Sequence, residues 1–66
     1  MEGKIMHSLE IEIQTITEQC QLGNITVEER DYLLTEIRDV RLAQECADNE
    51  QMARYLVQAC NIAMSV

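Results

Sequence analysis

The side chains best suited to metal binding or nucleophilic chemistry are three cysteines and one histidine. They are Cys20, Cys46, Cys60 and His7, and no two of the cysteines have the C-x-x-C spacing of a zinc site. A complete set of zinc ligands would need carboxylates or further chains. Since free cysteine often packs as a small hydrophobic residue, we expect three structural thiols, a solvated His7, and neither metal nor cofactor.

The same residues bear on the compartment and on catalysis. An odd number of cysteines without a signal peptide is not typical of a secreted disulfide framework, so we expect a reducing compartment, the cytoplasm, or the virion for a phage-encoded chain. An enzyme needs a nucleophile, base or metal in a concave pocket, and 66 residues with one histidine and no Gly-rich loop supply little for one. We predict no catalytic residues.

The chain is acidic, with twelve Asp and Glu against five Lys and Arg and a formal net charge of −7. This sign disfavours direct binding to nucleic acid, and no apolar run is long enough to cross a bilayer, so we expect a soluble protein. Five acids are concentrated in one region: Glu28, Glu29, Asp31, Glu36 and Asp39. They form either an ordinary solvated helix face or a surface that masks the basic face of a nucleic-acid-binding protein.

These side chains must be positioned by the helices of one small domain, residues 1–66. Gly23 suits the left-handed position after a helix, and Thr26 with Glu29 has the form of a capping box that starts the next helix. The short turn between them predicts an antiparallel hairpin, with helices at about residues 4–22 and 27–47.

The stretch SLEIEIQTITEQ, residues 8–19, alternates apolar and polar residues as a strand does. A strand would put Ile16 out of phase. A helix instead aligns a seam in steps of three and four residues: Met6, Leu9, Ile13, Ile16 and Cys20. Ile11 alone then points elsewhere, and we predict a helix.

The second helix carries an apolar stripe through Leu33, Ile37, Val40 and Ala47. The apolar phase then changes, where Asp48 and Gln51 have capping-box spacing. We predict a break near Asp48 or Asn49 and a third helix at about residues 49–64. The alternative is one long bent helix.

The third segment is apolar around most of its circumference, because its polar residues follow one narrow stripe. It is either the central helix of a compact monomer or a helix that completes its burial against another chain. We predict the second arrangement, with these interface residues: Ile11, Met52, Tyr55, Val57, Ile62 and Met64.

Within CQLGNITVEERDYLLTEI, an apolar helix and a glycine precede an Ile-Thr-x-Glu-Glu helix start, at Gly23, Ile25, Thr26, Glu28 and Glu29. In this pattern residues 9–38 resemble the short C-terminal (SHOCT-type) helical hairpin of bacteria. The resemblance implies an oligomerising or protein-binding hairpin without catalytic residues. This chain departs from it by continuing well beyond residue 38.

Together these patterns predict an all-α fold, an antiparallel helical hairpin plus a third helix, completed by oligomerisation. The expected function is a non-enzymatic protein-protein interaction module, self-associating or part of a larger bacterial or phage assembly, such as a structural or adaptor protein. The alternative is a small acidic regulatory inhibitor of a nucleic-acid-binding protein. The two differ in salt dependence, because acidic-to-basic contacts weaken steeply with salt whereas apolar helix packing holds.

Overall fold

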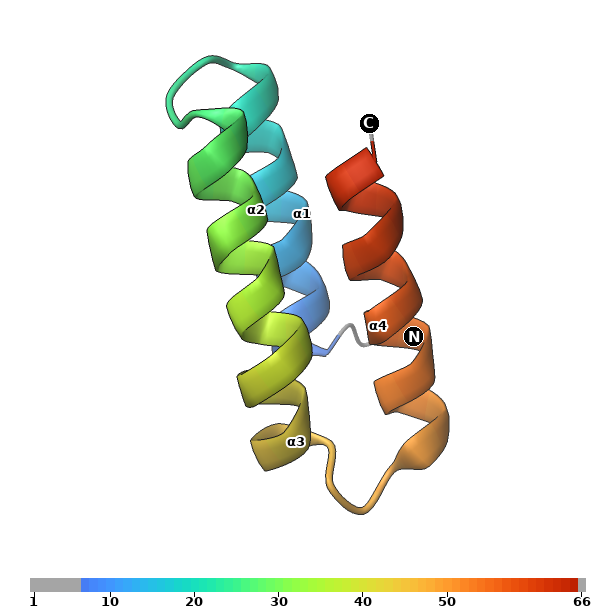
Figure 1. Ribbon diagram of the computed structural model, residues 1–66. Helices are drawn as coiled ribbons and strands as arrows, with labels where there is room; N and C mark the ends of the chain where they lie inside the picture. Colours follow the sequence, from blue (N-terminus) through green and yellow to red (C-terminus); the bar gives the residue numbers. More distant parts are fainter. Residues whose placement is uncertain (1–6, 66) are drawn as a thin grey trace, which may run out of the picture.

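The computed structural model describes residues 7–65, and within them the secondary structure is helical, without strands. The elements are α1 (Ser8–Gln21), α2 (Val27–Glu36), the π-helical segment η1 (Ile37–Arg41), α3 (Leu42–Glu45) and α4 (Glu50–Ser65). Because α2, η1 and α3 follow one another directly, they form one long helix antiparallel to α1, and α4 runs back beside both (Figure 1). The predicted all-α hairpin with a third helix is confirmed. The predicted start of the first helix and Met6 of its seam lie outside the described residues.

The turn between α1 and α2 is built by local capping. Gly23 has a φ of 81°, its N–H donates to the Cys20 carbonyl, and the Asn24 N–H donates to the Gln19 carbonyl. These two bonds are those of a Schellman motif, which satisfies the last carbonyls of a helix. The Asn24 side chain also donates to Gln19 Oε1 at 2.8 Å, where such motifs usually have an apolar contact.

The start of α2 has the predicted capping box. Thr26 Oγ1 accepts from the Glu29 N–H at 3.0 Å, and Glu29 Oε1 accepts from the Thr26 N–H at 2.8 Å. Two backbone donors that the helix cannot satisfy are therefore paired.

The core lies where the three helices meet. Its buried hydrophobic residues are Leu9, Ile13, Leu34, Ile37, Leu42, Cys46, Leu56, Cys60 and Ala63. The segment of residues 8–19 contributes to it as a helix: Leu9 and Ile13 are buried, Ile16 packs on them, and Ile11 is 50% exposed. The helix predicted from the seam is confirmed.

The second helix buries a different stripe from the predicted one. Leu34, Ile37 and Leu42 are buried, whereas Val40 is 47% exposed and Ala47 is also exposed. The cause is η1, in which the Leu42 N–H bonds to the Ile37 carbonyl, five residues back. One extra residue in the turn keeps Leu42 on the face of Ile37, so the stripe drawn with the α-helical period was wrong at Val40. It was also wrong before the π-turn, because Leu34 is the buried residue there and Leu33 lines a hollow on the outer face of α2.

The break before α4 lies where it was predicted, and the described chain is not one bent helix there, because residues 46–49 are non-helical. The capping residue is Asn49, whose Oδ1 accepts from the Met52 N–H at 3.1 Å, so the predicted Asp48 and Gln51 box was wrong. An amide oxygen at the N-cap satisfies the same donor that a carboxylate would.

Arginines of the second helix reach both neighbouring helices. Arg41 donates to the two carboxylate oxygens of Glu12 on α1, at 3.2 and 2.9 Å. Arg30, buried in α2, donates to the Met64 carbonyl near the end of α4 at 2.9 Å, and Arg38 donates to an amide oxygen on α4 at 2.8 Å. Hydrogen bonds to Glu12 and to a second carboxylate raise the pKa of Arg41. These contacts fix the orientations of the helices, and they bond three guanidinium groups to acceptors on neighbouring helices of the same chain.

Candidate protein-interaction surfaces

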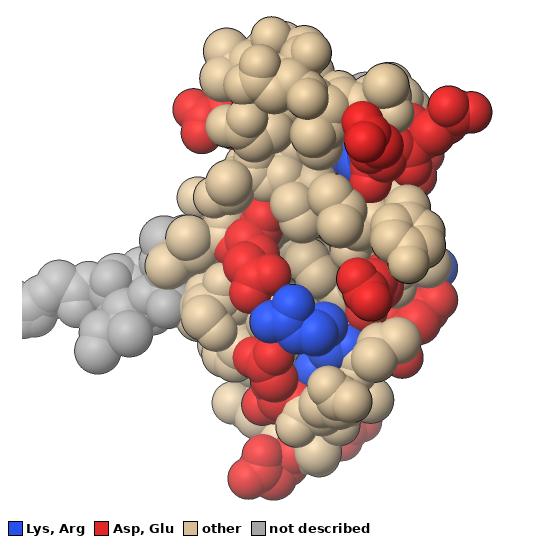
Figure 2. Space-filling model, turned by 90° about the vertical axis from the view of Figure 1, so that its left-hand side faces the viewer, with Lys and Arg blue, Asp and Glu red and all other residues tan. Residues whose placement is uncertain are grey.

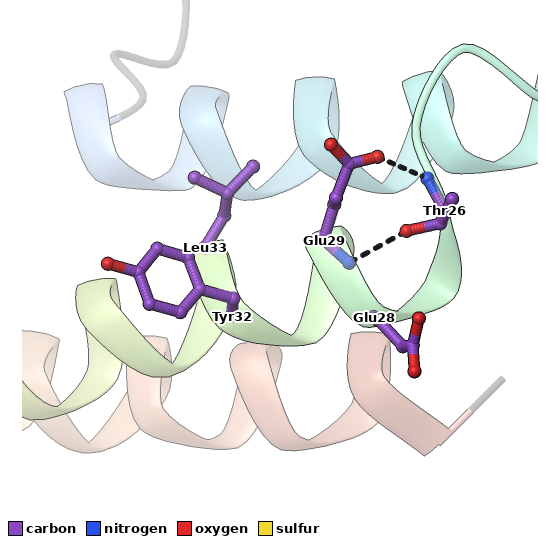
Figure 3. Close-up of a pocket in the computed structure, with 5 residues that line it drawn as sticks. All are labelled: Thr26, Glu28, Glu29, Tyr32 and Leu33. Carbon is purple, nitrogen blue, oxygen red and sulfur yellow. Dashed lines mark hydrogen bonds between the residues drawn. The ribbon is translucent and has the colours of Figure 1, made fainter.

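The outer face of α2 carries an exposed aromatic residue beside acids. Thr26, Glu28, Glu29, Tyr32 and Leu33 line an open hollow of about 330 Å³. Figure 3 shows Tyr32 and Leu33 side by side on the helix, with Glu28 and Glu29 one turn nearer its start. Tyr32 is 69% exposed, so an aromatic ring is offered to solvent between carboxylates.

The five acids of the predicted acidic face differ in their contacts. Asp31 pairs with Arg30 at 2.9 Å and Asp39 with Arg38 at 3.0 Å, while Glu29 serves the capping box. Within residues 7–65, Glu28 and Glu36 make no ion pair. On the face drawn in Figure 2, basic side chains gather near the centre with acidic side chains around them. Within residues 7–65, Glu29 likewise makes no ion pair, so Glu28 and Glu36 are the acids of this face that have neither an ion pair nor a capping role, one turn on either side of Tyr32.

A second surface is the groove between α1 and α4, which is mainly apolar. Its hollow of about 350 Å³ is lined by Thr17, Tyr55, Gln58, Ala59, Ile62 and Ala63. Tyr55 and Ile62 are 52% and 59% exposed. The Tyr55 hydroxyl donates to Glu10 Oε2 on α1, and this hydrogen bond together with the carboxylate charge raises the pKa of Tyr55. The ring is therefore held at one end of the groove.

The six predicted interface residues fall into two groups. Ile11, Tyr55 and Ile62 are exposed, whereas the others are partly buried against the core of the same chain: Met52, Val57 and Met64. Ile11 lies on the side of α1 opposite the buried Leu9, so only two of the exposed three share the groove. The small residues of the groove were not predicted, although Ala59 and Ala63 are spaced by one helical turn.

His7 is placed differently from the prediction of a solvated side chain. It is partly buried at the N-cap of α1, where its Nδ1 accepts from the Leu9 N–H at 3.0 Å, and its Nε2 lies 3.6 Å from Cys46 Sγ. With Nδ1 an acceptor, the neutral ring carries its proton on Nε2, which can donate to the sulfur but cannot take its proton. Burial raises the pKa of the Cys46 thiol, so this contact does not make a nucleophile.

Cys60 is fully buried and Cys20 partly buried. Among residues 7–65, no three His, Cys, Asp or Glu side chains are grouped to hold a metal ion. No helix of that part of the chain has both the length and the apolar character to cross a bilayer.

Comparison with protein-family models, with curated proteins and with solved structures gives no match to this chain. The resemblance to the SHOCT-type hairpin therefore stays a prediction.

Proposed function

We propose that this chain is a non-enzymatic helical module that binds other protein chains, as copies of itself or as part of a larger bacterial or phage assembly. The observation that carries the proposal is the exposure of large hydrophobic side chains on α1, on α2 and η1, and on α4. In residues 7–65 these are Ile11, Leu22, Val27, Tyr32, Val40, Tyr55 and Ile62. Isolated exposed hydrophobic residues are common on monomers, but aromatic and branched aliphatic side chains beside an apolar groove are typical of protein contact surfaces.

The two hollows lie on different helix faces, one along α2 and one between α1 and α4. A chain with two such faces can contact more than one neighbour, as a member of an assembly must.

The test is the mass of the purified chain in solution over a wide range of concentrations. We expect masses above the 7.6 kDa of one chain, with a melting temperature that rises with concentration. A monomer at every concentration, with a constant melting temperature and no partner recovered from its host, would contradict the proposal.

A second candidate function is the acidic inhibitor, favoured by Glu28 and Glu36, which make no ion pair within residues 7–65 and lie on either side of exposed Tyr32. A basic protein surface would complement this face. Its affinity should fall steeply with salt and should weaken further when both glutamates are changed to glutamine. The matched control is Glu50→Gln, because Glu50 is already paired with Arg54 at 2.8 Å. Binding that is unaffected by salt would exclude this candidate.

A further inference from the structure

Helix α4 presents a line of exposed residues in steps of four and three, part of which lines the groove beside α1. Along the helix they are Gln51, Tyr55, Gln58, Ile62 and Ser65. This spacing keeps side chains on one line of a helix and is the spacing by which packed helices meet. Polar and apolar residues alternate along the line, so their order is the same when read from either end, with Gln58 at its centre.

A line of this kind is complementary to itself under a two-fold axis. Residues 55 and 62 lie three and four residues from residue 58, so in an antiparallel copy they come within about one residue's rise of the same level, roughly 1.5 Å. Tyr55 would then pack against the partner's Ile62, and Gln58 would meet its own equivalent. A glutamine amide has both donors and an acceptor, so two of them can bond reciprocally. Ala59 and Ala63, which line the groove, leave room for the second helix.

Charge selects the occupant of the groove. At a net charge of −7, two copies repel, so they associate best where unpaired charge is least. Beside the line, Arg54 is paired with Glu50, and the Glu10 carboxylate, which keeps its charge, accepts a hydrogen bond from the Tyr55 hydroxyl. A basic partner would find little to recognise on this uncharged line and would instead favour the outer face of α2. The low charge of the line permits a second acidic copy there, and the order of its residues, the same from either end, is what fits the groove to that copy.

We infer that two chains form a symmetric dimer through this surface, with their α4 helices antiparallel and Gln58 on the two-fold axis. The inference rests on the proposed function and specifies which surface performs the self-association. Such a contact is isologous, because the same residues are used on both copies, and it closes without leaving the groove open for a third.

The test is a charge exchange at the axis, made in the full chain and followed by sedimentation equilibrium. Gln58→Glu and Gln58→Lys each place like charges opposite one another in a dimer of one variant, so the dissociation constant should rise more than about tenfold. An equal mixture of the two should recover the dimer, because opposite charges then meet. Gln58 is exposed, so neither change should alter the helix content.

The matched controls are Gln44→Glu and Gln44→Lys, which make the same changes of charge at an exposed glutamine of α3. Their dissociation constants should equal that of the unchanged chain, with no recovery on mixing. Ile62→Glu should also abolish the dimer while the circular dichroism of the helices persists, because Ile62 is 59% exposed in the single chain.

The outcomes separate the inference from the proposed function. A dimer that is indifferent to both Gln58 variants would overturn the inference and leave the proposed function standing. A chain that stays monomeric but binds another host protein directly would do the same. A chain that neither self-associates nor binds a partner would overturn both.

Discussion

Deletion of Val40 should leave the bundle folded, although removing a residue from the middle of a helix usually disrupts it. The π-turn of η1 places Leu42 five positions after Ile37, where an α-helix would return to the same face after four. Without Val40, the two buried residues become neighbours at the ordinary α-helical spacing and stay on one face. The lost side chain is 47% exposed, so we expect the free energy of unfolding to change by no more than about 1 kcal/mol.

Deletion of Tyr32 is the matched comparison, because Tyr32 is also exposed but lies in the regular part of the helix. Each residue turns an α-helix by about 100°, so this deletion turns Leu34 and Ile37 away from the core relative to Arg30. Burial of one such side chain contributes about 1.5–3 kcal/mol, and two contribute roughly 3–6 kcal/mol. A small domain has a total stability of about 5 kcal/mol, so this variant should be largely unfolded.

Urea unfolding followed by far-UV circular dichroism, at one fixed protein concentration, measures both variants on one scale. We expect the Val40 deletion to keep a cooperative transition with a midpoint near that of the unchanged chain. If the two deletions were equally destabilising, the π-turn would not be what keeps Leu42 and Cys46 in the core. The π-turn would then not explain why Val40, predicted to be buried, is exposed.

Three further outcomes are expected. Thr26→Ala removes the hydroxyl that accepts the Glu29 N–H and should lower stability by about 1 kcal/mol, or the melting temperature by roughly 4–8 °C. Iodoacetamide should modify Cys20 before Cys60, since burial raises the pKa of the Cys60 thiol, and mass spectrometry after partial labelling shows the order. Because the folded state raises the pKa of Tyr55, its contribution to stability is present below the unfolded value of about 10 and is lost as pH rises above it. Glu10→Ala should weaken that loss in alkaline unfolding curves.

The parts of the fold that could be predicted from the sequence depend on contacts between near neighbours. The Thr26 and Glu29 box joins residues three apart, and Gly23 was recognisable because its left-handed conformation favours glycine. The seam of α1 follows the same rule, because regular helical spacing alone sets which side chains share a face.

The parts that could not be predicted depend on contacts distant in sequence. Arg30 is 5% exposed because its guanidinium reaches the Met64 carbonyl on another helix, which no local pattern reveals. The π-turn is a second feature of this kind. The chain is α-helical on both sides of it, and only the burial of both Ile37 and Leu42 favours the extra residue. His7 was expected in solvent because Cys46, its neighbour in space, is far away in the chain.

The candidate surface was predicted in part for the same reason. A helix that is apolar nearly all round must bury more than one side, and α4 does so by packing against α1 and the second helix together. That packing accounts for Met52, Val57 and Met64 within a single chain. It does not account for Tyr55 and Ile62, which remain more than half exposed after both neighbours are in place. Intrachain packing therefore explains the breadth of the apolar surface, and the line centred on Gln58 is the part of α4 that this packing leaves exposed and on which the inferred dimer depends.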